Sequence, residues 1–157
     1  MKKCPHCGGD ISKYDNPFPT ADILIYSKEK GLVLVERRNP PHGLALPGGF
    51  IETGESAEHA AMREAKEETN LDVRLLGILG VYSQPGRDPR FHTLTTAFVA
   101  EAADEAALQA GDDAGRAAFH PVGSIRGLCF DHDLVVGHFR DWLAGKRPLL
   151  PCGSGEA

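Results

Sequence analysis

The sequence predicts one α+β domain, and three observations carry this prediction. The chain has 157 residues, a length that suits one domain with a sizeable core. Several short runs rich in apolar and β-branched residues are typical of strands. Two longer stretches carry helix-forming residues, one of them with apolar side chains at helical spacing. We expect the domain at residues 18–147, a short cysteine-containing segment at 1–17 and a flexible tail at 148–157.

The expected strands begin with a β-hairpin. Residues 20–27 and 31–37 are apolar and β-branched, and a short turn from Lys28 to Lys30 joins them. The segment at 102–115 is rich in alanine, glycine and acids, so we expect a mobile loop with a helical turn at 105–109. The full set of expected strands covers residues 20–27, 31–37, 44–46, 72–83, 91–101 and 116–122.

Two helices are expected, each with a recognisable start. The first begins after a Pro-Gly-Gly turn at Ser56, an N-cap residue, and its body is rich in alanine. The second follows Asp131, another N-cap residue, and ends at Gly145. Its apolar side chains repeat at helical spacing, so Phe139 and Trp142 are expected to pack in the core.

The first helix carries three acids on one face. Glu64, Glu67 and Glu68 fall at i, i+3 and i+4, where like charges repel, and Arg63 can reach Glu67 one turn on. A hard divalent cation explains such a triplet, because Mg²⁺ and Mn²⁺ take oxygen ligands and let substrate phosphates complete their shell. The alternative is a solvated acidic face on a surface helix.

The stretch from Gly49 to Leu71 resembles the Nudix box, G-x5-E-x7-R-E-U-x-E-E-x-G-U, in which U is an aliphatic residue. The single departure is Asn70, where the family has glycine, and asparagine also tolerates the left-handed turn that ends a helix. The resemblance implies a Nudix hydrolase, with an α/β/α sandwich built around a mixed β-sheet. The positions that match in register are Gly49, Glu55, Arg63, Glu64, Ala65, Glu67, Glu68 and Leu71.

The same resemblance implies roles for these residues. Glu55 and Arg63 would orient the metal ligands. One carboxylate must take the proton of the attacking water, and Glu64 is the first candidate. The competing candidates are the acids of the following loop, Glu105, Asp112 and Asp113. The implied ligands of Mg²⁺ (or Mn²⁺) are the Gly48 carbonyl and the side chains of Glu64, Glu67 and Glu68.

A second informative stretch is the loop at 81–90, V-Y-S-Q-P-G-R-D-P-R. Arg87 and Arg90 could bind a diphosphate through bidentate contacts; the alternative is a surface turn with both arginines solvated. The loop resembles the Y-S-x-P-x-R-D-P-R loop of ADP-ribose pyrophosphatases. Residues 130–132, F-D-H, resemble the motif of that group at the head of its last helix. Both resemblances imply hydrolysis of ADP-ribose to AMP and ribose 5-phosphate.

Other functions stay open at this point. Residues 83–85 begin the S-Q-P motif of the NADH pyrophosphatases, yet the aromatic continuation is missing, which places NADH second. A nucleoside triphosphate is a further candidate substrate. A non-catalytic nucleotide-binding Nudix sensor is the alternative of another class; such relatives typically lose box carboxylates, and this chain retains all of them.

The N-terminal cysteines suggest a zinc knuckle. Cys4 and Cys7 form a C-x2-C followed by glycine, which is half of a knuckle, and some NADH pyrophosphatases carry a full zinc ribbon. No second C-x2-C exists, and the remaining candidates are His6, Cys129 and Cys152. Structural Zn²⁺ at Cys4 and Cys7 is therefore a candidate with an incomplete ligand set, and a free-thiol turn is the alternative.

Composition narrows the partners. A net charge of −5 and a pI of about 5.8 argue against a nucleic-acid partner and for a small nucleotide that brings its own metal. No apolar run is long enough to span a bilayer, and no secretory signal is evident. The irregular spacing of the four cysteines does not indicate a disulfide framework, so we expect the protein in the reducing cytoplasm. A homodimer is a candidate, because some ADP-ribose hydrolysing relatives build one site from two chains.

Overall fold

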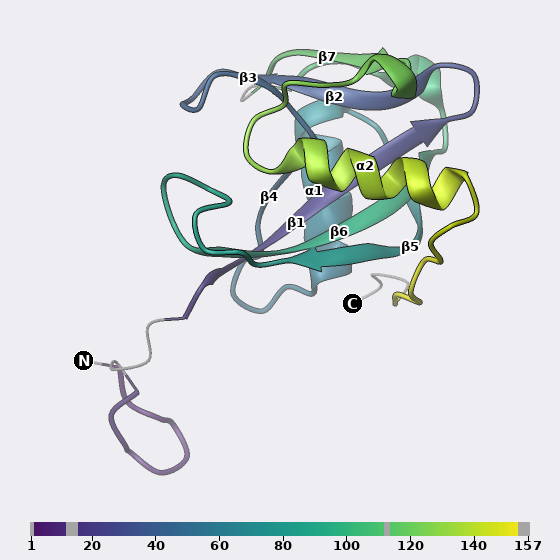
Figure 1. Ribbon diagram of the computed structural model, residues 1–157. Helices are drawn as coiled ribbons and strands as arrows, with labels where there is room; N and C mark the ends of the chain where they lie inside the picture. Colours follow the sequence, from purple (N-terminus) through teal and green to yellow (C-terminus); the bar gives the residue numbers. More distant parts are fainter. Residues whose placement is uncertain (1, 12–15, 112–113, 154–157) are drawn as a thin grey trace.

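A mixed sheet of seven strands lies between two helices (Figure 1). The structure, a computed structural model, describes residues 2–11, 16–111 and 114–153. The helices are α1 (Ala57–Thr69) and α2 (His132–Leu143), and two 3₁₀ turns are η1 (Glu105–Ala107) and η2 (Val122–Ser124). The strands are β1 (Phe18–Ser27), β2 (Gly31–Arg37), β3 (Gly43–Ala45), β4 (Gly48–Phe50), β5 (Val73–Tyr82), β6 (Thr93–Ala102) and β7 (Ala114–His120).

The sheet has the order β3-β2-β1-β6-β5, with β4 paired to β1 and β7 paired to β2. β1 and β6 run parallel, and the other described pairs are antiparallel, so the predicted mixed sheet is confirmed. The predicted hairpin of β1 and β2 is also present. It pairs only beside its turn, where Tyr26 lies opposite Leu32 and Ser27 opposite Gly31, because the earlier part of β1 pairs with β4.

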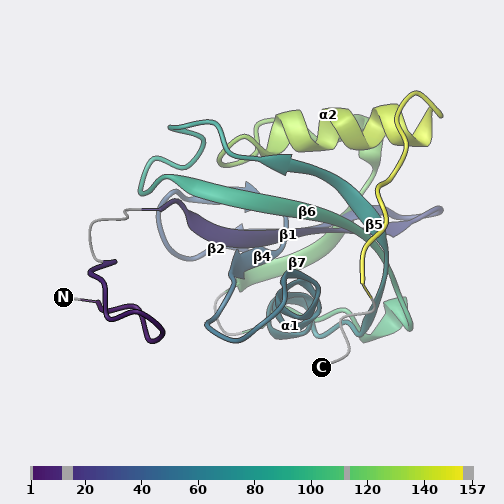
Figure 2. The same cartoon turned by 90° about the horizontal axis from the view of Figure 1, so that it is seen from below.

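The two helices cover opposite faces of the sheet (Figure 2). An apolar layer of buried side chains lies between the sheet and each helix. Successive residues of a strand point to opposite faces. Ile23 and Ile25 of β1 therefore pack with the alanines of α1, whereas Leu24 packs on the side of α2 with Phe139. Phe139 is fully buried and Trp142 packs against the same layer, as the sequence predicts. The α/β/α sandwich is confirmed.

The ends of α1 are formed by the residues that the sequence indicates. The Ser56 side chain accepts a hydrogen bond from the His59 N–H at 3.1 Å. Asn70 adopts the left-handed conformation, with φ of 59°, and its N–H donates to the Lys66 carbonyl at 2.9 Å. Asp131 stands at the N-cap position of α2, but its side chain caps nothing because its carboxylate binds elsewhere in the fold.

Residues 149–153, part of the segment expected as a tail, contact the sandwich at two places. Leu150 exchanges two backbone hydrogen bonds with Ile78 of β5, both at 2.8 Å. The Gly153 N–H donates to the Glu58 carboxylate on α1 at 2.9 Å. This segment therefore pairs with part of the outer edge of β5 and connects that strand to α1.

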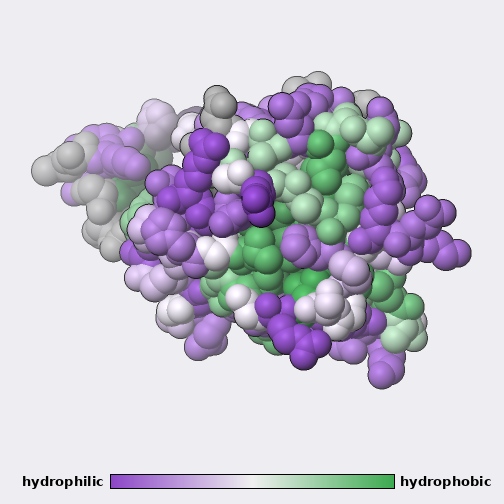
Figure 3. Space-filling model, turned by 90° about the horizontal axis from the view of Figure 1, so that it is seen from above, coloured by the Kyte–Doolittle hydropathy of each residue, from purple (hydrophilic) through white to green (hydrophobic). Residues whose placement is uncertain are grey.

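The outer surfaces differ in character. Residues 2–11 lie apart from the sandwich in both ribbon views (Figures 1 and 2). On the face that carries β7, hydrophobic residues gather in the middle and hydrophilic residues form the rim (Figure 3). No helix of the described residues is long and apolar enough to cross a membrane.

Candidate active site

A cleft of about 390 Å³ opens beside α1, β4 and the end of β2. A smaller cavity of about 50 Å³ adjoins it on the side of β1 and the loop before β6. The cleft wall on α1 is formed by the charged residues of the box, Arg63, Glu64, Glu67 and Glu68. The cleft and the cavity share the lining residues Arg37, Gly48, Gly49, Phe50 and Arg90.

Arg63 is the centre of the charged wall. Its Nε and Nη2 donate to the Glu55 carboxylate at 2.8 and 3.0 Å, and Nη1 donates to Glu64 at 2.8 Å and to Glu67 at 3.1 Å. Nη2 also donates to the Phe50 carbonyl at 3.0 Å. The hydrogen bonds from Arg63 lower the pKa of Glu55 to about 2, so Glu55 stays ionised. The pair thus fixes the orientation of the neighbouring glutamates.

Two carboxylates on this wall resist ionisation in the metal-free chain. Burial raises the pKa of Glu68 to about 8, although its carboxylate accepts a hydrogen bond from the Gly48 N–H at 2.9 Å. Burial also raises the pKa of Glu64, against the opposing effect of Arg63. Carboxyls with raised pKa values in a cleft are typical of functional sites, and a cation bound between them would favour their charged forms.

The oxygen donors of this wall suit Mg²⁺. Among the described residues, no group of three or more His, Cys, Asp or Glu side chains is placed as a ready metal cage, and Arg63 contacts both Glu64 and Glu67. Mg²⁺ usually binds one or two carboxylates and fills its shell with waters and substrate phosphates. The half-buried Glu68 beside Glu64 therefore fits this ion without a closed cage. Coordination by the Gly48 carbonyl stays a prediction.

The raised pKa of Glu68 predicts a pH-dependent stability of the metal-free protein. A carboxyl whose pKa rises from 4.5 to about 8 on folding stabilises the fold fully below 4.5, and this contribution is lost as the pH rises through 8. We expect the free energy of unfolding in EDTA, measured by urea denaturation, to fall between about pH 5 and about pH 8.5. Glu68→Gln should remove most of the decline; an unchanged decline in that variant would contradict the assignment.

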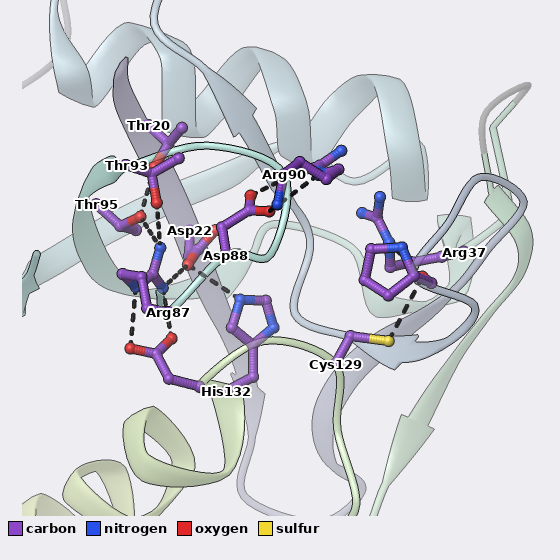
Figure 4. A network of polar contacts seen from close by, with 12 residues as sticks. Thr20, Asp22, Arg37, Arg87, Asp88, Arg90, Thr93, Thr95, Cys129 and His132 are labelled. Carbon is purple, nitrogen blue, oxygen red and sulfur yellow. Dashed lines mark hydrogen bonds and ion pairs between the residues drawn. The ribbon is translucent and has the colours of Figure 1, made fainter. Parts of the chain in front are cut away.

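Arg87 lies inside a polar network rather than at the surface of the cleft (Figure 4). Its side chain is 4% exposed, and its Nε and Nη2 donate to the Asp131 carboxylate at 2.9 and 2.6 Å. Nη1 donates to Thr93 at 3.0 Å and also to Thr95, while Nη2 lies 3.6 Å from Asp22 Oδ2. The guanidinium thus joins the loop before β6 to α2. Diphosphate binding by Arg87 stays a prediction that these contacts disfavour.

His132 joins the same network to the turn before β4. The Leu46 N–H donates to His132 Nδ1 at 3.0 Å, which leaves the ring proton on Nε2. Nε2 lies 3.2 Å from Asp22 Oδ2, although this buried oxygen has no well-aligned hydrogen bond among the described residues. Asp22 is therefore held mainly by its closeness to the donors of His132 and Arg87. The start of α2 is thereby connected to β1 and to the turn before β4.

Arg37 and Arg90 line both the cleft and the adjoining cavity, and Arg38 lines the cleft alone. Arg90, whose side chain is 35% exposed, donates from Nε and Nη2 to the Asp88 carboxylate at 3.0 and 2.8 Å. Arg37 ends β2, and its Nε donates to the Pro41 carbonyl at 2.9 Å. Arg37 and Glu68 line the same cleft, and the charge of Arg37 partly opposes the rise in the pKa of Glu68. No motif in the sequence marks Arg37 for this position.

Glu105, the one loop acid among the described residues, does not join the cleft. Glu105 forms an ion pair with Lys30 at 3.0 Å, at the turn before β2. Lys30 and Arg37 flank opposite ends of that strand, roughly 20 Å apart at the usual rise of a strand. Glu105 is therefore not placed to take a proton in the cleft. Asp112 and Asp113 lie outside the described residues.

The zinc prediction finds no support. Cys4 and Cys7 are free thiols. Cys129 is near the Pro41 carbonyl at 3.6 Å, and Cys152 packs against the layer under α1. Within residues 2–11, 16–111 and 114–153, no group of three or more candidate ligands is placed to hold an ion. A structural zinc site is not assigned.

The sandwich and its acid-lined cleft form an arrangement that suits metal-assisted hydrolysis of phosphate esters and anhydrides. Comparison with family models makes the class specific. The NUDIX domain model matches residues 16–143, and the chain belongs to this family.

Individual relatives agree with this membership. An ADP-ribose pyrophosphatase of Methanocaldococcus jannaschii is 39% identical over 140 residues, which cover 87% of this chain and 82% of the relative. The crystal structure of a NUDIX hydrolase from Nitrosomonas europaea has a TM-score of 0.74 at 22% identity and covers 96% of this chain and 97% of that one. The NUDIX domain of Shewanella oneidensis NrtR, solved with ADP ribose, has a TM-score of 0.74 at 24% identity, with 86% and 94% covered. The two structures show the shared fold, and the chain is a Nudix hydrolase.

Proposed function

We propose that this chain hydrolyses ADP-ribose to AMP and ribose 5-phosphate with bound Mg²⁺ or Mn²⁺. The observation that carries the proposal is the 39% identity to the pyrophosphatase of M. jannaschii. That similarity covers 87% of the chain, which is long enough to include both the box and the arginine loop. The arrangement of the cleft supports it, because arginines outside α1, among them Arg37 and Arg90, line the cleft together with the glutamates of that helix.

The box residues would divide the chemistry among them. Glu64, Glu67 and Glu68 would hold the metal, which supplies charge neutralisation for an in-line displacement at the diphosphate. Glu55 and Arg63 keep the glutamates oriented through the hydrogen bonds described above. Glu64 would accept the proton of the attacking water, since burial already raises its pKa toward the range that a general base needs.

Arg37 and Arg90 would bind the diphosphate from the side opposite the glutamates. Both line the cleft and the adjoining cavity, so a molecule that spans the two spaces would contact both arginines. A planar guanidinium matches phosphate oxygens with paired hydrogen bonds. Arg87 would act indirectly, because it anchors the loop that carries Arg90 to Asp131 of α2.

A substrate panel tests the proposal. Purified protein with Mg²⁺ should hydrolyse ADP-ribose with a kcat/KM at least about tenfold above that for NADH or a nucleoside triphosphate, and should not turn over in EDTA. Chromatography of the products should give AMP and ribose 5-phosphate in equal amounts. Faster hydrolysis of NADH or of a triphosphate would move the assignment to that substrate. Tight binding of ADP-ribose without turnover would indicate the sensor function.

A further inference from the structure

Phe130 adopts a backbone conformation that is unfavourable for its side chain. Its φ is 59°, and apart from glycines only Asn70 shares a positive φ among the described residues. Asparagine tolerates this left-handed region, whereas a bulky aromatic residue is an outlier there. Such outliers persist when the surrounding structure requires them, and they cluster at functional sites. Glycine or asparagine would suit this position better. We therefore expect the aromatic ring of Phe130 to have a role that offsets its unfavourable backbone conformation.

The ring of Phe130 lies close to the guanidinium groups of both Arg37 and Arg90. The Arg37 guanidinium carbon is 4.8 Å from the ring centroid, and the Arg90 guanidinium carbon is 5.3 Å from it. Both distances fall within the range of cation–π attraction. Arg37 arrives from the end of β2 and Arg90 from the loop before β6, so Phe130 is the common contact of two cations from separate elements.

Both guanidiniums keep donors for a ligand. Among the described residues, the hydrogen bond of Arg37 to a protein acceptor uses only its Nε, at the Pro41 carbonyl. Arg90 binds Asp88 through Nε and Nη2, which leaves Nη1. Two like charges brought to one wall repel each other, and the negative face of an aromatic ring offsets that repulsion without consuming any N–H donor.

We propose that Phe130 is a positioning residue whose ring holds Arg37 and Arg90 together as a two-guanidinium clamp for the diphosphate of the substrate. This inference rests on the proposed function, because it takes a diphosphate to be the group that occupies the cleft. The ring does not need to touch the substrate. It adds one shared contact to the separate hydrogen bonds that hold Arg37 at Pro41 and Arg90 at Asp88, and so sets the spacing of the two cations.

The test removes the ring and keeps the backbone. Phe130→Asn suits the left-handed conformation, so the variant should fold with an unchanged or higher melting temperature. Isothermal titration in EDTA, where no turnover occurs, would measure the Kd of ADP-ribose and, separately, of inorganic diphosphate. We expect both Kd values to rise by about fivefold to thirtyfold, because two arginine side chains would then have to be ordered on binding, and Phe130→Tyr to stay within about twofold.

A matched control exists outside the cleft. Lys30 lies over the ring of Phe119 at 5.4 Å, so Phe119→Leu removes a comparable contact and should leave both Kd values unchanged. A double-mutant cycle then tests whether the loss of affinity in Phe130→Asn acts through Arg37. In an Arg37→Met background, Phe130→Asn should cost clearly less affinity than in the parent, because one of the two positioned cations is already gone. With Mg²⁺, KM should rise while kcat changes little.

The outcomes separate this inference from the proposed substrate. Weaker diphosphate binding by Phe130→Asn, in a protein that does not bind ADP-ribose, would support the clamp and remove the substrate assignment. Parental affinity of Phe130→Asn for both ligands, or an equal loss in the Arg37→Met background, would overturn the clamp, as would a parent that binds neither ligand. Phe130→Gly suits the same backbone; if both it and Phe130→Asn fail to fold, the ring serves the fold and the clamp is rejected.

Discussion

Glu68→Gln is expected to lower kcat/KM for ADP-ribose by about 10²- to 10⁴-fold, the rate equivalent of the several kcal/mol that metal support supplies. Glutamine keeps the shape of the side chain, and its amide oxygen can still accept the hydrogen bond from the Gly48 N–H. What the substitution removes is the negative charge, which a bound cation needs. The loss should appear mainly in kcat and in a higher Mg²⁺ concentration for half-maximal rate.

A second glutamate of the same helix provides the control for Glu68→Gln. Glu58 lies in the first turn of α1 and accepts a hydrogen bond from the Gly153 N–H, away from the cleft. Glu58→Gln makes the same chemical change and should keep kcat/KM within about twofold of the parent. The metal assignment fails if Glu68→Gln retains turnover within about threefold, because the loss of even an outer metal contact usually costs tenfold or more.

Local spacing explains why the box helix was predictable. A helix places residues three and four positions apart on one face, so the contact of Arg63 with Glu67 follows from sequence positions alone. The two helix caps are also local features and could be predicted from the sequence. Ser56 accepts a hydrogen bond from a residue three positions on, and Asn70 needs only its own left-handed conformation. The packing of Phe139 and Trp142 could be predicted for the same reason, from apolar side chains at helical spacing.

Long-range contacts explain what could not be predicted. The loop motif singles out Arg87, but its burial depends on Asp131, 44 residues away, and on two threonines of β6. No local sequence pattern indicates such a partner. The sequence therefore cannot distinguish an arginine that is buried in an ion pair between two elements from an arginine that faces solvent and binds phosphate. Arg37 is a second example, because its position at the cleft follows from where β2 ends in the sheet.

The contacts of residues 149–153 also depend on residues far away in the sequence. A Pro- and Gly-rich end with no apolar periodicity is typical of flexible chain. Its attachment depends on the exposed edge of β5, and on a glycine in that strand: a Cβ on Gly77 would lie 2.7 Å from the Leu150 carbonyl oxygen. The glycine is visible in the sequence, but the segment that it accommodates lies more than seventy residues later.

Gly49→Ala is expected to abolish most activity without unfolding the protein. A Cβ at this position would lie 2.2 Å from Glu64 Oε1 and 2.5 Å from its carboxyl carbon, far inside contact distance. The nearest atoms belong to the end of a flexible side chain, so the Glu64 carboxylate can move aside while the backbone stays in place. The displaced carboxylate would lose its 2.8 Å contact with Arg63 and its place in the cleft. We expect kcat/KM to fall by at least about 10²-fold, as for loss of a metal ligand and proton acceptor.

Three measurements make the Gly49→Ala result specific. The melting temperature should change by only a few degrees at most, roughly the effect of 1 kcal/mol in a domain of this size. Gly137→Ala is the matched control: this glycine lies in α2 with no atom within 4 Å of the added Cβ, so activity should stay at the parental level. In a Glu64→Ala background, Gly49→Ala should cost little more, because the clash has disappeared together with the carboxylate. An equally large further loss in that background would show that Gly49 acts through its own backbone, and the proposed displacement of Glu64 would be rejected.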